Sequence, residues 1–228
     1  MIDARRDGGA AGLRESVYAN LRRRILVCDL LPGHPLDIGD LAAEFGTSRT
    51  PVRDALHRLS HENLVEISPR SQTRVAPVTL QDLIDLLNLR EAIGPMAARL
   101  AAQSPPAELE KLSEETEFGY GLAADSSSVL SASHLFHCTI ARLSGNVRLH
   151  RITESLFEDL ERILRLCSAR PLEPGEPLDD HRKLLDALRD RDGKRAAEIE
   201  LRHIRKAREV VIRLALDSGV FANQRLHS

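Results

Sequence analysis

Residues 41–67 read LAAEFGTSRTPVRDALHRLSHENLVEI, and this stretch predicts two short helices that meet across a tight turn. The first helix follows Asp37, whose side chain suits an N-cap, and ends at Gly46, a residue favoured just after a helix. The second begins at Ser48, another N-cap residue, and tolerates Pro51 in its first turn, where no N–H is needed. Its apolar stripe consists of Val52, Ala55, Leu56 and Leu59. Such a pair is a helix-turn-helix.

The flanking segments extend this pair into a winged helix. Before it, residues 14–28 carry apolar side chains at helical spacing, and Pro32-Gly33 ends that segment. After it, residues 64–67 and 73–76 read as two short strands joined by a turn, which is a β-hairpin. We therefore expect three helices plus a β-hairpin in the N-terminal part of the chain.

The rest of the chain is expected to be helical. Pro77 stops the hairpin, and Thr79 followed by Asp82 resembles a helix start. Helical periodicity predicts helices at about 80–103, 106–124, 129–143, 147–170, 178–190 and 194–217. The expected division is a disordered tail at 1–13, a winged helix-turn-helix domain at 14–76, a linker at 77–79, an all-α helical bundle at 80–217 and a tail at 218–228.

The composition agrees with a mostly α globular protein. Of 228 residues, 42% are apolar and 29% are charged, with a net charge of -2, which excludes a disordered polyelectrolyte. Only 3% are aromatic, which disfavours a β-sandwich or barrel. The three cysteines lack CxxC spacing, which argues against a disulfide framework and fits a reducing compartment. With no leader or membrane-spanning pattern, we expect a cytoplasmic protein without a membrane partner.

The second helix of the pair presents polar side chains away from its apolar stripe. A step of about 100° per residue places Thr50, Arg53 and His57 on that face, with Arg49 at the N-terminal rim. A helix N-terminus favours phosphate, and an Arg fork can address guanine in the major groove. Arg70 on the hairpin would add further DNA contacts. Two arginines alone would also fit a solvated helix face, but the surrounding winged helix favours DNA.

Four stretches of this region resemble the DNA-binding domain of GntR-type bacterial transcription regulators: VYANLRRRIL, LLPGHPLD, the stretch quoted above and VAPVT. SRTPVR, followed by AL, RL and NLV, is the most specific part of the resemblance. It implies contacts with operator DNA by Ser48, Arg49, Thr50, Arg53 and the wing turn at 69–72, which contains Arg70 and Gln72. Gln72 stands where the family usually has a glycine, which argues against close insertion of this wing into the minor groove.

His137, His181 and His203 fall on three different expected helices of the second domain. Helical bundles build metal sites from side chains on facing helices, and a neutral imidazole is a common ligand for Zn and Ni. The chain has nine histidines, so their spacing alone favours ordinary surface or core histidines over a metal site.

Residues 80–217 resemble the all-helical FCD effector domain of the FadR-type subfamily, through LREAIGPMAARLAA, SASHLFHCTIARLSGN, DDHRKLLDALRDRDGKRA and LRHIRKA. The resemblance implies a divalent metal, held by these three histidines and by an Asp four residues before the first. Ser133 stands at the Asp position, and a neutral hydroxyl is a poor ligand beside a carboxylate. The site is therefore expected to be a three-histidine site with water, a weakened site or a lost one. His134 lies about 100° round the helix from Ser133, so we do not expect it to substitute.

Arg90 in LNLREAI matches an arginine that, in related domains, faces the effector pocket and pairs with a carboxylate. It would fit equally well as a surface arginine in i,i+4 ion pairs. Gly94 stands where the family usually has a Glu. The resemblance implies a small organic acid as effector, bound beside Arg90.

Together these residues predict a ligand-responsive transcription regulator and not an enzyme. We expect a homodimer that binds a palindromic double-stranded DNA operator and is modulated by a small carboxylate-bearing metabolite. One alternative keeps the fold but makes the metal itself the signal. Another, a three-histidine metal-dependent hydrolase, lacks a general base, because Asp180 points off the face of His181 and no HExxH motif occurs.

Overall fold

A computed structural model of the chain describes residues 6–68, 73–122, 126–167 and 175–221. The chain divides into two compact units, Met1–Val78 and Thr79–Ser228. The described residues are mostly helical with one small two-stranded sheet, which confirms the expected fold class. None of the described helices is long and apolar enough to cross a membrane.

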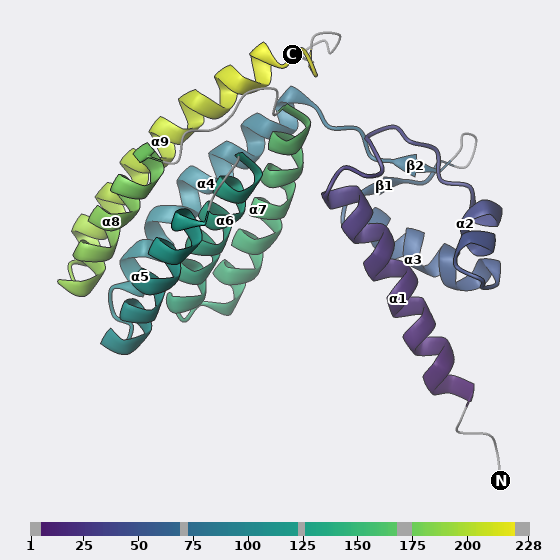
Figure 1. Ribbon diagram of the computed structural model, residues 1–228, viewed down its shortest axis with the longest axis horizontal. Coiled ribbons are helices and arrows are strands. Elements are labelled where there is room, and N and C mark those ends of the chain that lie inside the picture. The colour runs from purple at the N-terminus through teal and green to yellow at the C-terminus, as the bar shows by residue number, and fades with distance from the viewer. Residues whose placement is uncertain (1–5, 69–72, 123–125, 168–174, 222–228) are drawn as a thin grey trace. The chain divides into compact units, whose positions relative to one another are not determined.

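The N-terminal unit is the expected winged helix (Figure 1). Its elements are α1 (Arg6–Leu26), α2 (Ile38–Glu44), α3 (Arg49–His61), β1 (Val65–Glu66) and β2 (Arg74–Val75). The two strands pair antiparallel, with Val65 opposite Val75. Val17, Leu21 and Ile25 follow one another at four-residue steps along α1 and are completely buried. They pack in one core with the apolar stripe of α3, formed by Val52, Ala55, Leu56 and Leu59.

Local sequence explains the turn between α2 and α3. The Asp37 carboxylate accepts hydrogen bonds from the backbone N–H groups of Gly39 and Asp40, which caps α2 as expected. Gly46 has a φ of +60°, a conformation that glycine adopts without strain. Ser48 occupies the N-cap position of α3, but its side chain makes no capping hydrogen bond. The hydroxyl of Ser48 thus does not stabilise α3 in the way we expected.

The structure differs from the expected division at both ends of the chain. Helix α1 begins at Arg6, so residues 6–13 are helical rather than part of a disordered tail. This segment extends a helix whose later turns are packed, which removes the cost of starting a new helix. Phe221, expected in the C-terminal tail, is buried. Residues 1–5 and 222–228, and the wing residues Arg70 and Gln72, lie outside the described residues.

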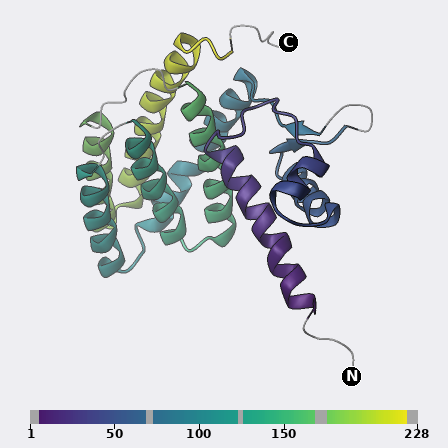
Figure 2. The ribbon, with the colours of Figure 1, turned by 45° about the vertical axis from the view of Figure 1, so that its right-hand side comes forward.

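The C-terminal unit is a helical bundle (Figure 2). Its described helices are α4 (Leu80–Ala101), α5 (Pro106–Gly121), α6 (Ser126–Leu143), α7 (Val147–Cys167), α8 (Gly175–Arg189) and α9 (Gly193–Asp217). The expected start of α4 is a complete capping box, in which Thr79 and Asp82 bond each other's backbone N–H groups. Helix α4 packs against α6, α7 and α9, while α8 packs against α5 and α9. Side chains from four helices therefore converge in the interior.

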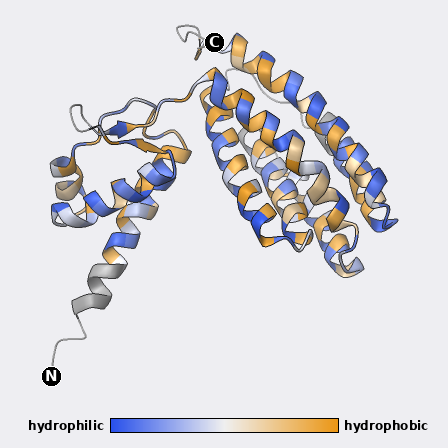
Figure 3. Ribbon diagram, turned by 180° about the vertical axis from the view of Figure 1, so that it is seen from behind, coloured by the Kyte–Doolittle hydropathy of each residue, from blue (hydrophilic) through white to orange (hydrophobic). Residues whose placement is uncertain are grey.

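Hydrophobic and hydrophilic residues alternate along the helices of the bundle (Figure 3). Buried apolar residues of these helices form its core. The interior is not wholly apolar, however. Its buried side chains with ionisable groups include Arg90, His137, His181, Glu200 and His203, each of which exposes no more than 6% of its surface. Burying a polar or charged group is unfavourable unless it has a hydrogen-bond or ion-pair partner. The contacts of these side chains, and any atoms left without a partner, therefore indicate which ligands the interior would suit.

Candidate functional site

The outward face of α3 carries the expected DNA-contacting residues. Ser48, Arg49, Thr50 and Arg53 are exposed, whereas Val52 and Leu56, between and after them, are buried. These polar side chains lie in the first turns of the helix, where backbone N–H groups lack helical partners. This end of α3 therefore combines cationic side chains with unpaired backbone donors, as phosphate binding requires.

Other arginines of the N-terminal unit are held in ion pairs. Arg22 contacts Glu62 at 2.8 Å, Arg24 contacts Glu44 at 2.8 Å and Arg58 contacts Glu15 at 2.7 Å. Within the described part of the chain, Arg49 and Arg53 form no such ion pair. The positive charge of this pair is thus not offset by a bonded carboxylate among those residues.

The three expected histidines come together in the bundle. His137 on α6, His181 on α8 and His203 on α9 each present one nitrogen, and these nitrogens lie within 4.8 Å of one another. The Nε2 atoms of His137 and His181 are 3.3 Å apart. Their expected placement on facing helices therefore produces one buried cluster, which we call the histidine cluster.

Each imidazole of the histidine cluster meets an oxygen at its Nδ1 atom. His137 Nδ1 lies 3.1 Å from a Glu200 carboxylate oxygen, and His181 Nδ1 lies 3.1 Å from the Tyr120 hydroxyl. His203 Nδ1 is 3.8 Å from the nearer Asp180 oxygen. In metal sites, an acceptor at one ring nitrogen commonly orients the ring and leaves the other nitrogen for the metal.

Burial keeps the histidine cluster neutral at physiological pH. It lowers the pKa of His137, lowers that of His203 to about 3, and, with the neighbouring charges, holds that of His181 well below its ordinary value. Burial alone would raise the pKa of Glu200, but His137, His203 and Arg90 lower it to about 2. The interior thus combines three neutral imidazoles with one ionised carboxylate.

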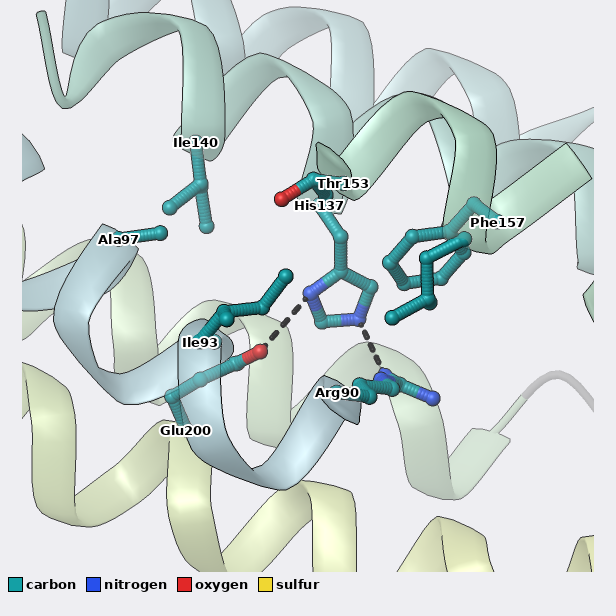
Figure 4. A pocket seen from close by; sticks show the side chains of 10 residues that line it. Arg90, Ile93, Ala97, His137, Ile140, Thr153, Phe157 and Glu200 are labelled. Carbon is teal, nitrogen blue, oxygen red and sulfur yellow. Dashed lines mark hydrogen bonds and ion pairs between the residues drawn. The ribbon is translucent and has the colours of Figure 1, made fainter. Parts of the chain in front are cut away.

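Arg90 lies beside the cluster and not at the surface. Its guanidinium donates to His137 Nε2 at 2.9 Å and lies 4.9 Å from the centre of the Phe157 ring (Figure 4). Its Nε atom has no hydrogen-bond partner among the described residues. Arg90, His137, Phe157 and Glu200 line a cavity of about 10 Å³, room for about one water molecule.

Three further residues weighed from sequence lie around the histidine cluster. Ser133 hydrogen-bonds the Tyr120 hydroxyl, which in turn contacts His181. His134 pairs with Glu161 on α7 at 2.9 Å and lies outside the histidine cluster. Asp180 is buried on the outer side of His203 and accepts a hydrogen bond from Lys206.

Sequence reasoning missed Glu200. It lies in the charged stretch AEIELRHIRKA of α9 and resembles the exposed carboxylates around it. A signal was nevertheless present, because Glu200 is four residues after Ala196 and four before Ile204, on the buried stripe of α9. An acidic residue on an apolar stripe predicts a buried partner, which here is His137.

The residues of the histidine cluster fit a divalent metal ion. Neutral imidazoles are ligands for Zn and Ni, and two nitrogen ligands of a tetrahedral zinc lie about 3.4 Å apart, close to the 3.3 Å between His137 and His181. With its Nδ1 proton donated to Glu200, His137 directs the Nε2 lone pair toward His181 and Arg90. This lone pair on His137 Nε2 already accepts a hydrogen bond from the positively charged Arg90. A metal cation placed near His181 could accept the same lone pair instead.

The fold and these contacts define a class: a winged-helix protein with a second, helical domain whose interior contains a buried histidine cluster. Residues 13–75 match the family described as bacterial regulatory proteins, gntR family, and residues 85–206 match the FCD domain. The chain therefore belongs to the GntR family of transcription regulators, with a C-terminal FCD domain. It is a DNA-binding regulator, and the family leaves no role for the hydrolase alternative.

Relatives resemble the chain over most of their length. An uncharacterized HTH-type transcriptional regulator in an unstable DNA locus of Streptomyces ambofaciens is 30% identical over 207 residues, 90% of this chain and 87% of that protein. A probable D-xylose utilization operon transcriptional repressor of Paenarthrobacter nicotinovorans is 29% identical over 209 residues, 87% and 90% of the two chains. The solved structure of E. coli McbR/YncC shares the fold, with a TM-score of 0.71 and 24% identity, and covers 88% of this chain and 97% of its own.

Proposed function

We propose that this protein binds a palindromic operator as a homodimer and that a small carboxylate-bearing metabolite in the cytoplasm modulates the binding. The observation that carries the proposal is the contrast between two sets of arginines. Arg49 and Arg53 are exposed at the start of α3, whereas Arg90 is buried beside a cavity. The first pair suits an external polyanion, and the second suits a small anion that enters the bundle.

For the DNA half, Ser48, Arg49 and Thr50 would contact backbone phosphates and Arg53 would reach base edges. Phosphate contacts position a recognition helix, and base contacts give sequence preference. Arg70 and Gln72 of the wing turn would add backbone contacts beside the operator half-site. Two copies related by a twofold axis would read two half-sites, which is why the operator should be palindromic.

For the effector half, Arg90 supplies the reason for a carboxylate. A buried guanidinium with an unpartnered Nε–H, among the described residues, is stabilised by an anion that accepts from it. The cavity beside it has room for about one water molecule, so a larger effector must displace side chains. Such a ligand would favour one conformation of the bundle and shift the population by its differential affinity.

For the metal, His137, His181 and His203 would hold Zn or Ni, which would supply positive charge to an incoming carboxylate. Water or the effector's own carboxylate would complete the ligand set, since Ser133 offers none. Metal retention and effector binding would then support each other. A second candidate, in which the metal itself is the signal, rests on the same three imidazoles and the same fold.

The test uses full-length protein stripped of metal by a chelator and a duplex selected from a random DNA library. Fluorescence anisotropy is measured with and without zinc, and with malonate or its neutral analogue malonamide as probes. We expect two protomers per duplex, affinity that falls steeply with salt, and a change on adding malonate with zinc but not malonamide. If zinc alone gives the full change, the metal-responsive candidate is correct. Binding as a monomer, or no selected sequence, would overturn the operator proposal.

A further inference from the structure

Glu200 is the buried acid that the proposed function leaves unused. It lies on α9 three residues before His203, exposes 3% of its surface and places one carboxylate oxygen 3.1 Å from His137 Nδ1. Its second oxygen has no hydrogen-bond partner among the described residues. A carboxyl group at this depth is unfavourable unless its oxygens are hydrogen-bonded or it offsets positive charge, so its position calls for a reason.

The backbone of α4 leaves the space that Glu200 occupies. Gly94 faces α9, and a Cβ at this position would lie 3.2 Å from the Glu200 oxygen and 2.6 Å from Ile204 Cδ1. The latter distance is shorter than real Cβ contacts allow. A side chain at Gly94 would therefore crowd Ile204 and Glu200. Figure 4 shows the contact that the Glu200 carboxylate makes with His137.

Charge balance gives this carboxylate a role. Three neutral imidazoles contribute no negative charge, while a divalent ion adds two positive charges beside that of Arg90. Asp180, the other acid near the histidine cluster in the described part of the chain, is already paired with Lys206 at 3.2 Å and Lys183 at 3.5 Å. Glu200 has no lysine or arginine within ion-pair distance among those residues; its charge acts on that of buried Arg90 and, through His137, would also act on an ion held by the histidine cluster.

We propose that Glu200 is a positioning residue for metal binding, and that it supplies from α9 the negative charge that Ser133 cannot supply from α6. It accepts the Nδ1 proton of His137, which leaves Nε2 as the coordinating nitrogen, and it offsets the charge of the ion through that ring. This inference rests on the proposed metal site. Unlike a ligand, Glu200 acts through His137 and need not touch the ion.

The simplest rival role for Glu200 is that of a counter-ion to Arg90, which would concern folding only. The two roles differ in what the substitution Glu200→Gln changes. As a positioning residue, it should lower zinc affinity by about 10–100-fold, the range found when partners of metal ligands are removed. As a counter-ion, it should lower stability and leave zinc affinity as it was.

The experiment measures zinc affinity of the full-length chain by competition with a chromophoric chelator. Glu161→Gln is the matched control, because Glu161 also pairs with a histidine Nδ1, that of His134, outside the histidine cluster. We expect Glu200→Gln to lose about 10–100-fold and Glu161→Gln to match the wild type. Equal affinity of wild type and Glu200→Gln would overturn the proposal.

A second comparison covers the case in which Glu200→Gln leaves Arg90 unbalanced and does not fold. Arg90→Gln and the double variant Arg90→Gln/Glu200→Gln differ only in the carboxylate, and the double variant carries no buried unpaired charge at these positions. Zinc should bind at least about 10-fold more weakly to the double variant. A ratio of one would contradict the proposed role even if Glu200→Gln alone cannot be purified.

Nitrogen NMR of the zinc-loaded chain gives a readout that a purely structural role would not change. The His137 Nδ1–H proton should resonate far downfield in the wild type, because it is bonded to a carboxylate, and shift upfield in Glu200→Gln, whose neutral amide oxygen is a weaker acceptor. The failures are separable: a wild type that binds no zinc overturns the metal site and this role together, whereas zinc binding unaffected by Glu200→Gln overturns only the role of Glu200. Whether the chain binds an operator at all is a separate question that neither result decides.

Discussion

The two units of this protein place the charges of their candidate sites in opposite environments. In the N-terminal unit, Arg49 and Arg53 stand in solvent on a helix whose other face forms the core. In the C-terminal unit, Arg90 and three histidines replace part of the core itself. A surface charge needs only a rigid support, whereas a buried one needs partners from other helices. The first arrangement can therefore be read locally, and the second depends on tertiary structure.

The largest effect is expected for Leu21→Ala, which tests whether the two units are stabilised separately. Leu21 is completely buried in the N-terminal core, so its truncation should lower the free energy of unfolding by about 2–5 kcal/mol. Zinc affinity should remain unchanged, since Leu21 belongs to the N-terminal core and the core of the helical bundle consists of other residues. Urea unfolding followed by circular dichroism gives the first quantity. Leu13→Ala, at an exposed position of the same helix, is the control and should change stability by about 0.5 kcal/mol or less. A matching loss of zinc affinity in Leu21→Ala would show that the units are coupled.

Next in size is the effect of His181→Ala. His181 is completely buried, and the substitution removes one of the three proposed zinc ligands. Because changes to partners of ligands already cost about 10–100-fold, loss of a ligand should weaken zinc binding by more than about 100-fold. Elemental analysis of purified protein should fall from one zinc per chain to none. His150→Ala serves as control, since His150 is partly exposed on α7 and lies outside the histidine cluster. Unchanged zinc content in His181→Ala would remove the metal site from this bundle.

Arg53→Ala tests the exposed charges of the N-terminal unit, through their contribution to operator binding. If Arg53 reads a base, the variant should lose about 1–3 kcal/mol of operator binding and relax preference at one position per half-site. Arg58→Ala is a fitting control on the same helix, because Arg58 is engaged by Glu15 and lies over the Tyr18 ring. Fluorescence anisotropy measures the affinity of each variant for the operator and for a random duplex, and the difference between the two affinities shows whether Arg53 reads a base. Equal losses on both duplexes would make Arg53 a phosphate contact instead.

The smallest effect is expected for the His134–Glu161 pair, which is more buried than Arg53 and less buried than the histidine cluster. Hydrogen bonding by His134, against the opposing effect of burial, and the charge of Arg165 lower the pKa of Glu161 to about 2 from an ordinary 4.5. A lowered pKa stabilises the fold above about pH 4.5, and that stabilisation is lost as pH falls toward 2. Because the pair is partly exposed and therefore screened by solvent, Glu161→Gln should lower stability by at most about 1 kcal/mol at pH 7. The difference from wild type should vanish near pH 2 in acid-unfolding curves; a constant difference would assign the effect to packing.

Much of the fold was predictable because its signals are local. Asp37, Gly46 and the Thr79–Asp82 box each act within a few residues of their own position, and all three behave as their chemistry predicts. The helix start at Arg6 was missed because continuation of a packed helix is not a local signal. The absent capping bond of Ser48 shows that a suitable residue type does not ensure the bond.

The histidine cluster was predictable only through resemblance. Nothing in the spacing of His137, His181 and His203 shows that α6, α8 and α9 meet at these positions. The placement of Arg90 against His137 and of Glu200 behind it depends on the approach of α9 to α4 at Gly94. The periodicity of α9 places Glu200 on the buried stripe, but contacts between residues more than 40 positions apart leave no trace in the sequence, so its partner His137 could not be identified from it.

The deep burial of the histidine cluster also affects how fast a ligand can bind there. Its three imidazoles expose at most 6% of their surface, and the neighbouring cavity has room for about one water molecule. An ion or effector that reaches it must wait for helices of the bundle to separate, a motion on the microsecond-to-second scale. Uptake measured by stopped flow should therefore stop rising with ligand concentration and level off at the opening rate. The α3 face has no such gate, so operator encounter should remain proportional to DNA concentration.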